Sequence, residues 1–293
     1  MKISSTALKA KQSCASGYRW FARRFKSPAE YQSVIDALVD DGRVDDACWL
    51  LDQFGPIQSV LVVDAISAHA FVYAGSVQVR GEVDVDAMLR TGGSLKAGGS
   101  IRAGNAIWIG KDLHAGAGLR TLGSLRTGGD LVSSWSVEVH GALTCGGDLR
   151  VRGALACGAA MRGEGSTVVA EDLEVNGMIH CEKSLQVGGH LVCTEGLRAG
   201  HGIQVGQSIR SGMHIDAGWG IVAGSDITGE GAIRAGECIV SGGSVLPGTG
   251  FSLYAGLSAR RDAWPSCGRV VSRARPENLL SGFWDCVPSG ATA

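Results

Sequence analysis

The hydrophobic positions of this chain recur every six residues over most of its length. Steps of six from Val77 to Val245 visit 29 positions, of which 28 are aliphatic or Met and one is Thr167. Phe71 and Phe251 extend the same frame outward. Six residues advance about 600° in an α-helix, so these apolar positions would spread around a helix instead of forming one buried face. The period therefore argues against a helical repeat.

A small residue follows each aliphatic position two residues later, and glycine often comes next. SIRAGN and AIRAGE are examples, and the position after the small residue is glycine in 17 of the 29 units. Alternation over three residues places the aliphatic and the small side chain on one face of a short strand. Glycine would supply the unusual backbone torsion angles of a corner. Each unit therefore predicts a short strand followed by a corner.

Such units predict an all-β fold, a coil whose turns stack into parallel, in-register sheets. Three six-residue units per turn give a triangular parallel β-helix, and 29 units make about ten coils. At about 4.8 Å per turn the rod would be about 45 Å long. Its core would be a column of Leu and Ile beside a column of Ala, Val, Thr and Cys. The handedness of the coil is left open.

The two flanks differ in composition from the repeat and predict caps. The chain has 17 aromatic residues, of which 14 lie outside the repeat. A solenoid exposes its core and unpaired strand edges at both ends, and these must be covered. We predict a helical N-terminal cap at 1–56, the parallel β-helix at 57–250 and an aromatic-rich C-terminal cap at 251–293.

The N-terminal flank carries the signals of two helices. Ser27 can cap a helix that has Pro28 at its first position, with Glu30 three residues after the cap. Gly42 separates this helix from a second one. The side chains expected on the buried side are Val34, Leu38, Trp49, Leu50 and Leu51.

The repeat resembles those of the bactofilins, the polymer-forming bacterial cytoskeletal proteins. The resemblance rests on GSIRAG (99–104), GDLRVRG (147–153) and GAIRAG (231–236), and it covers about 170 of the 293 residues. It implies a triangular, right-handed β-helix and a scaffold that assembles end to end. This chain differs from the bactofilins in its aromatic-rich flanks, since bactofilins polymerise through bare ends with short tails.

The hexapeptide acyltransferases are less similar. Their left-handed coil usually has a small residue two positions before the aliphatic residue and glycine directly after it, whereas here the small residue comes two positions after and glycine three after. Those enzymes use a histidine near an acyl-carrier cleft, and the seven histidines here are scattered. We therefore expect a protein that is not an enzyme, with no catalytic residues, no cofactor and no metal site.

Three units per turn assign the residue after each aliphatic position to one of three outward faces. One face carries an arginine at every second turn. With the Trp and His between them, these arginines form a predicted binding stripe: Arg90, Trp108, Arg126, Arg162, His180, Arg198 and Arg234. Arginine suits acidic protein surfaces and phosphates. The alternative is that these residues only keep the face soluble and protect it from association.

Charge and cysteine content narrow the location and the partners. The chain has 27 Lys and Arg against 28 Asp and Glu, so its net charge of −1 gives no reason to expect nucleic acid as a partner. Its nine cysteines include no C-x-x-C pair and are odd in number, which argues against a zinc ribbon and a disulfide framework. We find no signal-peptide or membrane-spanning stretch, and we expect a cytoplasmic protein with no membrane span.

These observations favour a non-catalytic cytoplasmic scaffold that presents a rigid surface to a protein partner. A compact, capped solenoid would suit an immunity or inhibitor protein that blocks its partner, and this is one form of the hypothesis. The second hypothesis is a bactofilin-like cytoskeletal scaffold that self-associates end to end. A hexapeptide-type acyltransferase is the third.

Overall fold

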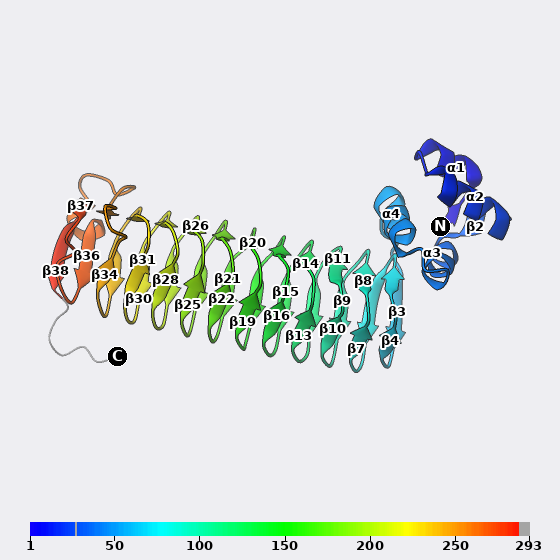
Figure 1. Cartoon of the computed structure of the whole chain (residues 1–293), viewed down its shortest axis with the longest axis horizontal. Helices are drawn as coiled ribbons and strands as arrows, with labels where there is room; N and C mark the ends of the chain where they lie inside the picture. The colour runs from blue at the N-terminus through cyan, green and yellow to red at the C-terminus, as the bar shows by residue number, and fades with distance from the viewer. Residues whose placement is uncertain (27, 287–293) are drawn as a thin grey trace.

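The chain folds into a long parallel β-solenoid with a helical unit at its N-terminal end (Figure 1). The computed structural model describes residues 1–26 and 28–286. Most strands contain three residues, and successive strands belong to different sheets, so the chain winds around one axis. The predicted fold class, an all-β parallel β-helix with a small helical N-terminal region, is confirmed.

A complete turn of the coil contributes one strand to each of three parallel sheets, and the turns at the ends of the coil are incomplete. Sheet I has 13 strands: β3 (Val60–Val63), β6 (Ser76–Val79), β9 (Leu95–Ala97), β12 (Leu113–Ala115), β15 (Leu131–Ser133), β18 (Leu149–Val151), β21 (Thr167–Val169), β24 (Leu185–Val187), β27 (Ile203–Val205), β30 (Ile221–Ala223), β33 (Ile239–Ser241), β36 (Arg269–Ser272) and β38 (Phe283–Cys286).

Sheet II has 12 strands: β5 (Phe71–Tyr73), β8 (Met88–Thr91), β11 (Ala106–Ile109), β14 (Leu125–Thr127), β17 (Leu143–Cys145), β20 (Met161–Gly163), β23 (Ile179–Cys181), β26 (Leu197–Ala199), β29 (Ile215–Ala217), β32 (Ile233–Ala235), β35 (Leu253–Tyr254) and β37 (Leu279–Ser281). Sheet III has 11 strands: β4 (Ile66–Ala68), β7 (Val83–Val85), β10 (Ile101–Ala103), β13 (Leu119–Thr121), β16 (Val137–Val139), β19 (Leu155–Cys157), β22 (Leu173–Val175), β25 (Leu191–Cys193), β28 (Ile209–Ser211), β31 (Ile227–Gly229) and β34 (Val245–Leu246).

Equivalent side chains stack on one another because the strands pair in register. Ile101 pairs with Leu119, and Leu119 pairs with Val137 one turn later. In a typical strand the first and third side chains are buried and the second faces outward, as in β18. The aliphatic positions therefore form continuous columns inside the coil, as predicted, and Leu131 and Leu143 are completely buried.

Several buried Thr, Ser and Cys side chains at the third position of a strand donate hydrogen bonds to corner carbonyls of the preceding turn, whereas others, such as Thr127 to the carbonyl of Gly129, bond within their own corner. Thr121 Oγ1 donates to the carbonyl of Asn105 (3.2 Å), Cys157 Sγ to that of Gly141 (3.2 Å) and Ser241 Oγ to that of Ser225 (2.7 Å). The cost of burying these groups is thereby offset. Burial raises the pKa of the Cys181 thiol to about 11, which is typical of an inert structural cysteine.

The corner glycines are explained by close approach between turns. The described glycines with positive φ are Gly42, Gly55, Gly250, Gly256 and Gly282. None of them occupies the repeated corner position, so the expectation of unusual torsion angles at the corners is wrong. A Cβ at Gly206 would instead overlap the carbonyl oxygen of Gly188 in the preceding turn. Glycine is required there because the corners of successive turns nearly touch.

The helical unit contains four helices and one pair of short antiparallel strands. Its helices are α1 (Ser5–Ala10), α2 (Ala15–Arg24), α3 (Tyr31–Asp40) and α4 (Val44–Phe54), and its strands are β1 (Lys2–Ile3) and β2 (Ala29–Glu30). Gly42 separates α3 from α4 with φ of 71°, as a helix boundary there predicts. The predicted helix start at Pro28 is wrong, because Ala29 and Glu30 pair with β1 and α3 begins only at Tyr31. Ser27, the predicted cap, lies outside the described residues.

The helical unit closes the edge of sheet II. The side-chain amide of Gln32 on α3 donates to the carbonyl of Val72 (3.1 Å) and accepts from the N–H of Ala74 (2.9 Å). These two bonds replace the ladder that a further strand would form on β5. Val34, Leu38, Leu50 and Leu51 are buried as expected, and Trp49 is half-buried.

The coil is longer than the ten turns expected, since sheet I contains 13 strands. The aromatic-rich C-terminal segment continues the coil through β35 to β38 and adds the short helix α5 (Trp264–Cys267). Strand pairing persists there although the spacing changes: Ile233 pairs with Leu253 and Ile239 with Val270. A strict period of six misses these turns for that reason. The domain boundaries at 56 and 250 stay predictions. None of the described helices has the length and apolar character needed to cross a membrane.

Replacement of a corner glycine by alanine should destabilise the coil. We expect Gly206→Ala to lower the free energy of unfolding by about 1–3 kcal/mol, because the added methyl forces two turns apart. Gly196→Ala is the matched control, since the nearest atom to its Cβ would be the carbonyl oxygen of His214 at 3.7 Å. Urea unfolding of the two variants measures the difference, and equal stabilities would contradict the close-approach explanation.

Candidate binding face

The seven residues of the predicted stripe lie in one register column on the outer face of sheet II. The column runs through nine turns in the order Arg90, Trp108, Arg126, Thr144, Arg162, His180, Arg198, Asp216 and Arg234. Each is the outward residue of its strand because the aliphatic and small residues on either side turn into the core. The structure thus brings all seven together, with Thr144 and Asp216 between them.

Acidic side chains neutralise part of the stripe. Glu182, from the corner after β23, lies 3.5 Å from Arg162 Nη2 and 2.9 Å from His180 Nε2. The hydrogen bond and charge of His180, with a smaller effect from Arg162, hold the pKa of Glu182 below its ordinary value. Arg234 pairs with Asp216 of the preceding turn at 3.5 Å. These arginines therefore carry less free charge than the sequence alone indicates.

Arg126 and Arg198 are the two stripe arginines that remain free of ion pairs with the residues that the structure describes, although the charge of Arg198 also contributes to lowering the pKa of Glu182. Both are exposed. They are separated by four turns, or about 19 Å at the usual spacing of strands. The rigid ladder beneath them fixes this separation.

The N-terminal end of the stripe lies in a cleft between α4 and sheet II. The cleft has a volume of about 440 Å³. Its walls include Asp52 from α4, Pro56 just after this helix, and Arg90, Trp108 and Arg126 from successive strands. Trp108 is 38% exposed and offers an apolar surface beside the free guanidinium of Arg126.

Arg90 fastens the helical unit to the solenoid. Its side chain is only 10% exposed and forms an ion pair with Asp52 on α4. Its guanidinium carbon lies 5.2 Å from the centre of the Trp108 ring, within the range of a cation–π contact. Burial raises the pKa of the Tyr31 hydroxyl and the Cys48 thiol, and the nearby Arg90 charge opposes both shifts. The charge of Arg90 is thus used in contacts between the helical unit and the solenoid.

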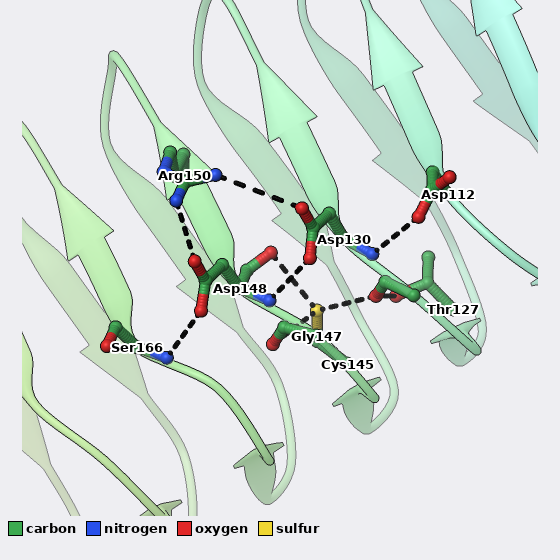
Figure 2. Close-up of polar contacts among 9 residues, drawn as sticks. Asp112, Thr127, Asp130, Cys145, Gly147, Asp148, Arg150 and Ser166 are labelled. Atoms are coloured by element: carbon green, nitrogen blue, oxygen red, sulfur yellow. Dashed lines mark hydrogen bonds and ion pairs between the residues drawn. The ribbon is translucent and has the colours of Figure 1, made fainter.

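A ladder of carboxylates follows the corner that leads into sheet I, and sequence reasoning missed it (Figure 2). Asp112 accepts the N–H of Asp130 (3.0 Å), Asp130 that of Asp148 (2.8 Å) and Asp148 that of Ser166 (2.9 Å). Arg150 contacts Asp148 at 2.6 Å and Asp130 at 3.9 Å. The signal in the sequence was the recurrence of Ser or Asp directly before the aliphatic position.

The carboxylate ladder holds turns together. Each carboxylate satisfies a backbone N–H of the next turn, so these groups act as corner braces. Within residues 1–26 and 28–286, no group of three or more His, Cys, Asp or Glu side chains is placed to hold a metal ion. The outer face of sheet II is therefore the candidate site that the geometry supports best.

Removal of Asp52 should loosen the junction between the helical unit and the rod. We expect Asp52→Ala to lower the free energy of unfolding by about 1–3 kcal/mol, because the buried Arg90 loses its charged partner. The double variant Arg90→Met/Asp52→Ala should lose less than the single one, since no unpaired charge remains. Asp64→Ala is the control, because Asp64 and Arg80 form an exposed pair. Urea unfolding tests this, and equal effects of the Asp52 and Asp64 changes would contradict it.

The helical unit is similar to a known family. Residues 1–54 match the family model described as the YdhT N-terminal domain, and this segment ends with the last residue of α4. No curated protein and no solved structure matches the chain. The similarity thus concerns the helical unit at the end of the rod.

Proposed function

We propose that this protein is a rigid, non-catalytic binding protein whose outer face of sheet II holds an acidic protein partner. The observation that carries the proposal is the pair of free arginines, Arg126 and Arg198, on one in-register column. Their side chains project from a ladder whose backbone is fully paired, so binding costs little ordering of the main chain. Carboxylates about 19 Å apart on the partner would match them.

The cleft beside α4 supplies the apolar part of the same surface. Trp and Arg are the residues most enriched among those that dominate binding energy at protein interfaces. Trp108 lies directly between Arg90 and Arg126 in the column, and the wall formed by α4 shields it on one side. A partner side chain in this cleft would contact the indole ring and the free guanidinium of Arg126 together.

Within this proposal, we favour an immunity or inhibitor protein that covers an acidic surface of its target in the cytoplasm. A rigid rod with charges at set distances suits selective blocking of one surface, because a mismatched charge pattern is penalised. The described cysteines are all free thiols, which fits a reducing compartment.

Reversal of the two free charges tests the binding face. We expect a tagged protein to recover a stoichiometric partner from its native cell, and Arg126→Glu/Arg198→Glu to abolish this recovery by like-charge repulsion. Arg210→Glu is the matched control, because Arg210 is the exposed outward residue of β28 on sheet III and has no ion pair in the described structure. Unchanged recovery by the double variant would contradict the proposal.

End-to-end assembly, the bactofilin-like alternative, is favoured by one feature. Strand β3 begins sheet I and pairs only with β6, so its outer edge is unpaired, and Val60 and Val62 are 58% and 54% exposed. Unpaired apolar edges promote strand addition.

Sedimentation velocity separates the two functions. A binding protein should sediment as one discrete particle at micromolar concentration, whereas a scaffold should form polymers. Val62→Lys should prevent these polymers, because a charge on an edge strand opposes pairing with another strand. Polymers of the unchanged protein would favour the scaffold and count against the binding protein.

A further inference from the structure

The positive charge of the helical unit is concentrated in its first part. Residues 1–26 contain seven Lys and Arg and no Asp or Glu, in a chain whose net charge is −1. Lys2 and Arg24 form ion pairs with Glu30 and Asp41. The exposed members that have no ion pair among the described residues are Lys9, Lys11, Arg19, Arg23 and Lys26, and Lys9 lies over the ring of Tyr18. Residues 27–56 carry seven Asp and Glu and one Arg, so the positive charge of the unit is local to its first part and is concealed by the balanced composition of the chain.

Arginines line a groove of about 710 Å³ beside α2. The groove is lined by Ser16, Arg19, Trp20, Arg23, Arg24, Asp41 and Arg43. Arg19 and Arg23 are four residues apart on one helix, a spacing at which like charges lower helix stability. Folding does not require these two like charges so close together, and an anionic ligand bound between them would reduce their repulsion.

An apolar cavity of about 280 Å³ lies next to this groove, between the helices of the unit. Its apolar walls are Leu8, Phe21, Val34, Leu38, Trp49 and Leu50. Asp45 and Asp46 also line it, and the charge of Asp46 is paired with Arg43. Trp20 lines both the cavity and the groove. Its indole nitrogen donates to Asp41 Oδ2 (2.7 Å), which holds the ring in place as a wall between the two hollows.

Gly17 keeps the boundary between the cavity and the groove open. It is the third residue of α2 and lines the cavity, although glycine within a helix costs up to about 1 kcal/mol relative to alanine. A Cβ at this position would lie 3.3 Å from Cys14 Sγ, 3.8 Å from Asp46 Oδ1 and 3.9 Å from Arg43 Nη2, so it would crowd the edge of the cavity near the groove. Glycine at position 17 is explained by the space that it leaves at the cavity edge, because it would not be chosen for helix stability.

We propose that the helical unit binds a short segment of a partner protein in which a bulky apolar side chain lies next to acidic residues. The apolar side chain enters the cavity against Trp20 and Trp49, and the carboxylates pair with Arg19 and Arg23. Small-ligand pockets usually measure about 300–1,000 Å³, so a cavity of about 280 Å³ suits one large side chain. This site is separate from the arginine stripe.

A nucleic acid and an anionic membrane fit this site less well than an acidic protein segment does. A nucleic acid would pair with the arginines but brings no apolar side chain for the cavity. A flat anionic membrane would meet an α2 surface without large exposed apolar residues, since the exposed residues of α2 are Ala15, Ser16, Arg19, Ala22, Arg23 and Arg24. Only a segment that joins an apolar group to carboxylates uses both hollows.

Fluorescence polarisation of labelled peptides with the full-length protein tests the proposal. Four 12-residue peptides serve as probes: a Leu-Phe pair flanked by Glu, the same pair flanked by Gln, the same pair flanked by Lys, and Glu flanking a Gly-Gly pair. We expect the first peptide alone to bind, with an affinity that falls as salt rises. Arg19→Glu/Arg23→Glu should weaken its binding at least tenfold.

Gly17→Leu, which fills the cavity edge, should also weaken binding at least tenfold, and its far-ultraviolet circular dichroism should show that the helices remain folded. Arg126→Glu/Arg198→Glu should leave peptide binding unchanged, so failure of the stripe and failure of this site are distinguishable. Binding of none of the peptides would overturn the proposal. Equal binding of the Gly-Gly or the Gln peptide would overturn it as well, as would binding only to a 20-nucleotide single strand or to vesicles of anionic phospholipid.

Discussion

In-register stacking of turns is the constraint on which the rest of this structure depends. Each turn forms its backbone hydrogen bonds with the turns before and after it, so equivalent residues must lie directly above one another. Corners approach so closely that a Cβ at Gly206 would overlap the preceding carbonyl. The same stacking lets Asp130 satisfy a backbone N–H of the next turn and lets buried thiols reach corner carbonyls. Shape, glycine content and buried polar groups all follow from this one arrangement.

Stacking also turns a repeat in sequence into a surface with set distances. The outward residues of sheet II form one column, so a charge at every second turn becomes a row of charges at regular intervals. Neighbouring corners and the helical unit then decide which charges remain free. Glu182 engages Arg162, and Asp52 engages Arg90, whereas Arg126 and Arg198 face solvent. The surface offered to a partner is thus smaller and more specific than the arginine stripe itself.

The side chains of the helical unit pack differently from those of the rod. Its helices pack by side chains of unequal size, which leaves a cavity between them, whereas the repeated core of the rod stacks like on like. It also closes an open sheet edge through Gln32 and places Asp52 beside Arg90. One small unit therefore closes the edge of sheet II and shapes the cleft beside the stripe.

The sequence by itself determined the coil, its three faces and the buried columns, because a six-residue period acts through pairing between adjacent turns. It also placed Arg126 and Arg198 on one face. It missed the outermost turns, where Ile239 pairs with Val270 across a longer connection, since a strict period cannot follow insertions. It did not reveal that Glu182 and Asp52 neutralise arginines, that Tyr31 begins α3, or that Gly17 borders a cavity. Only the tertiary structure decided these features, because each depends on contacts between unlike elements whose separation in the chain follows no period.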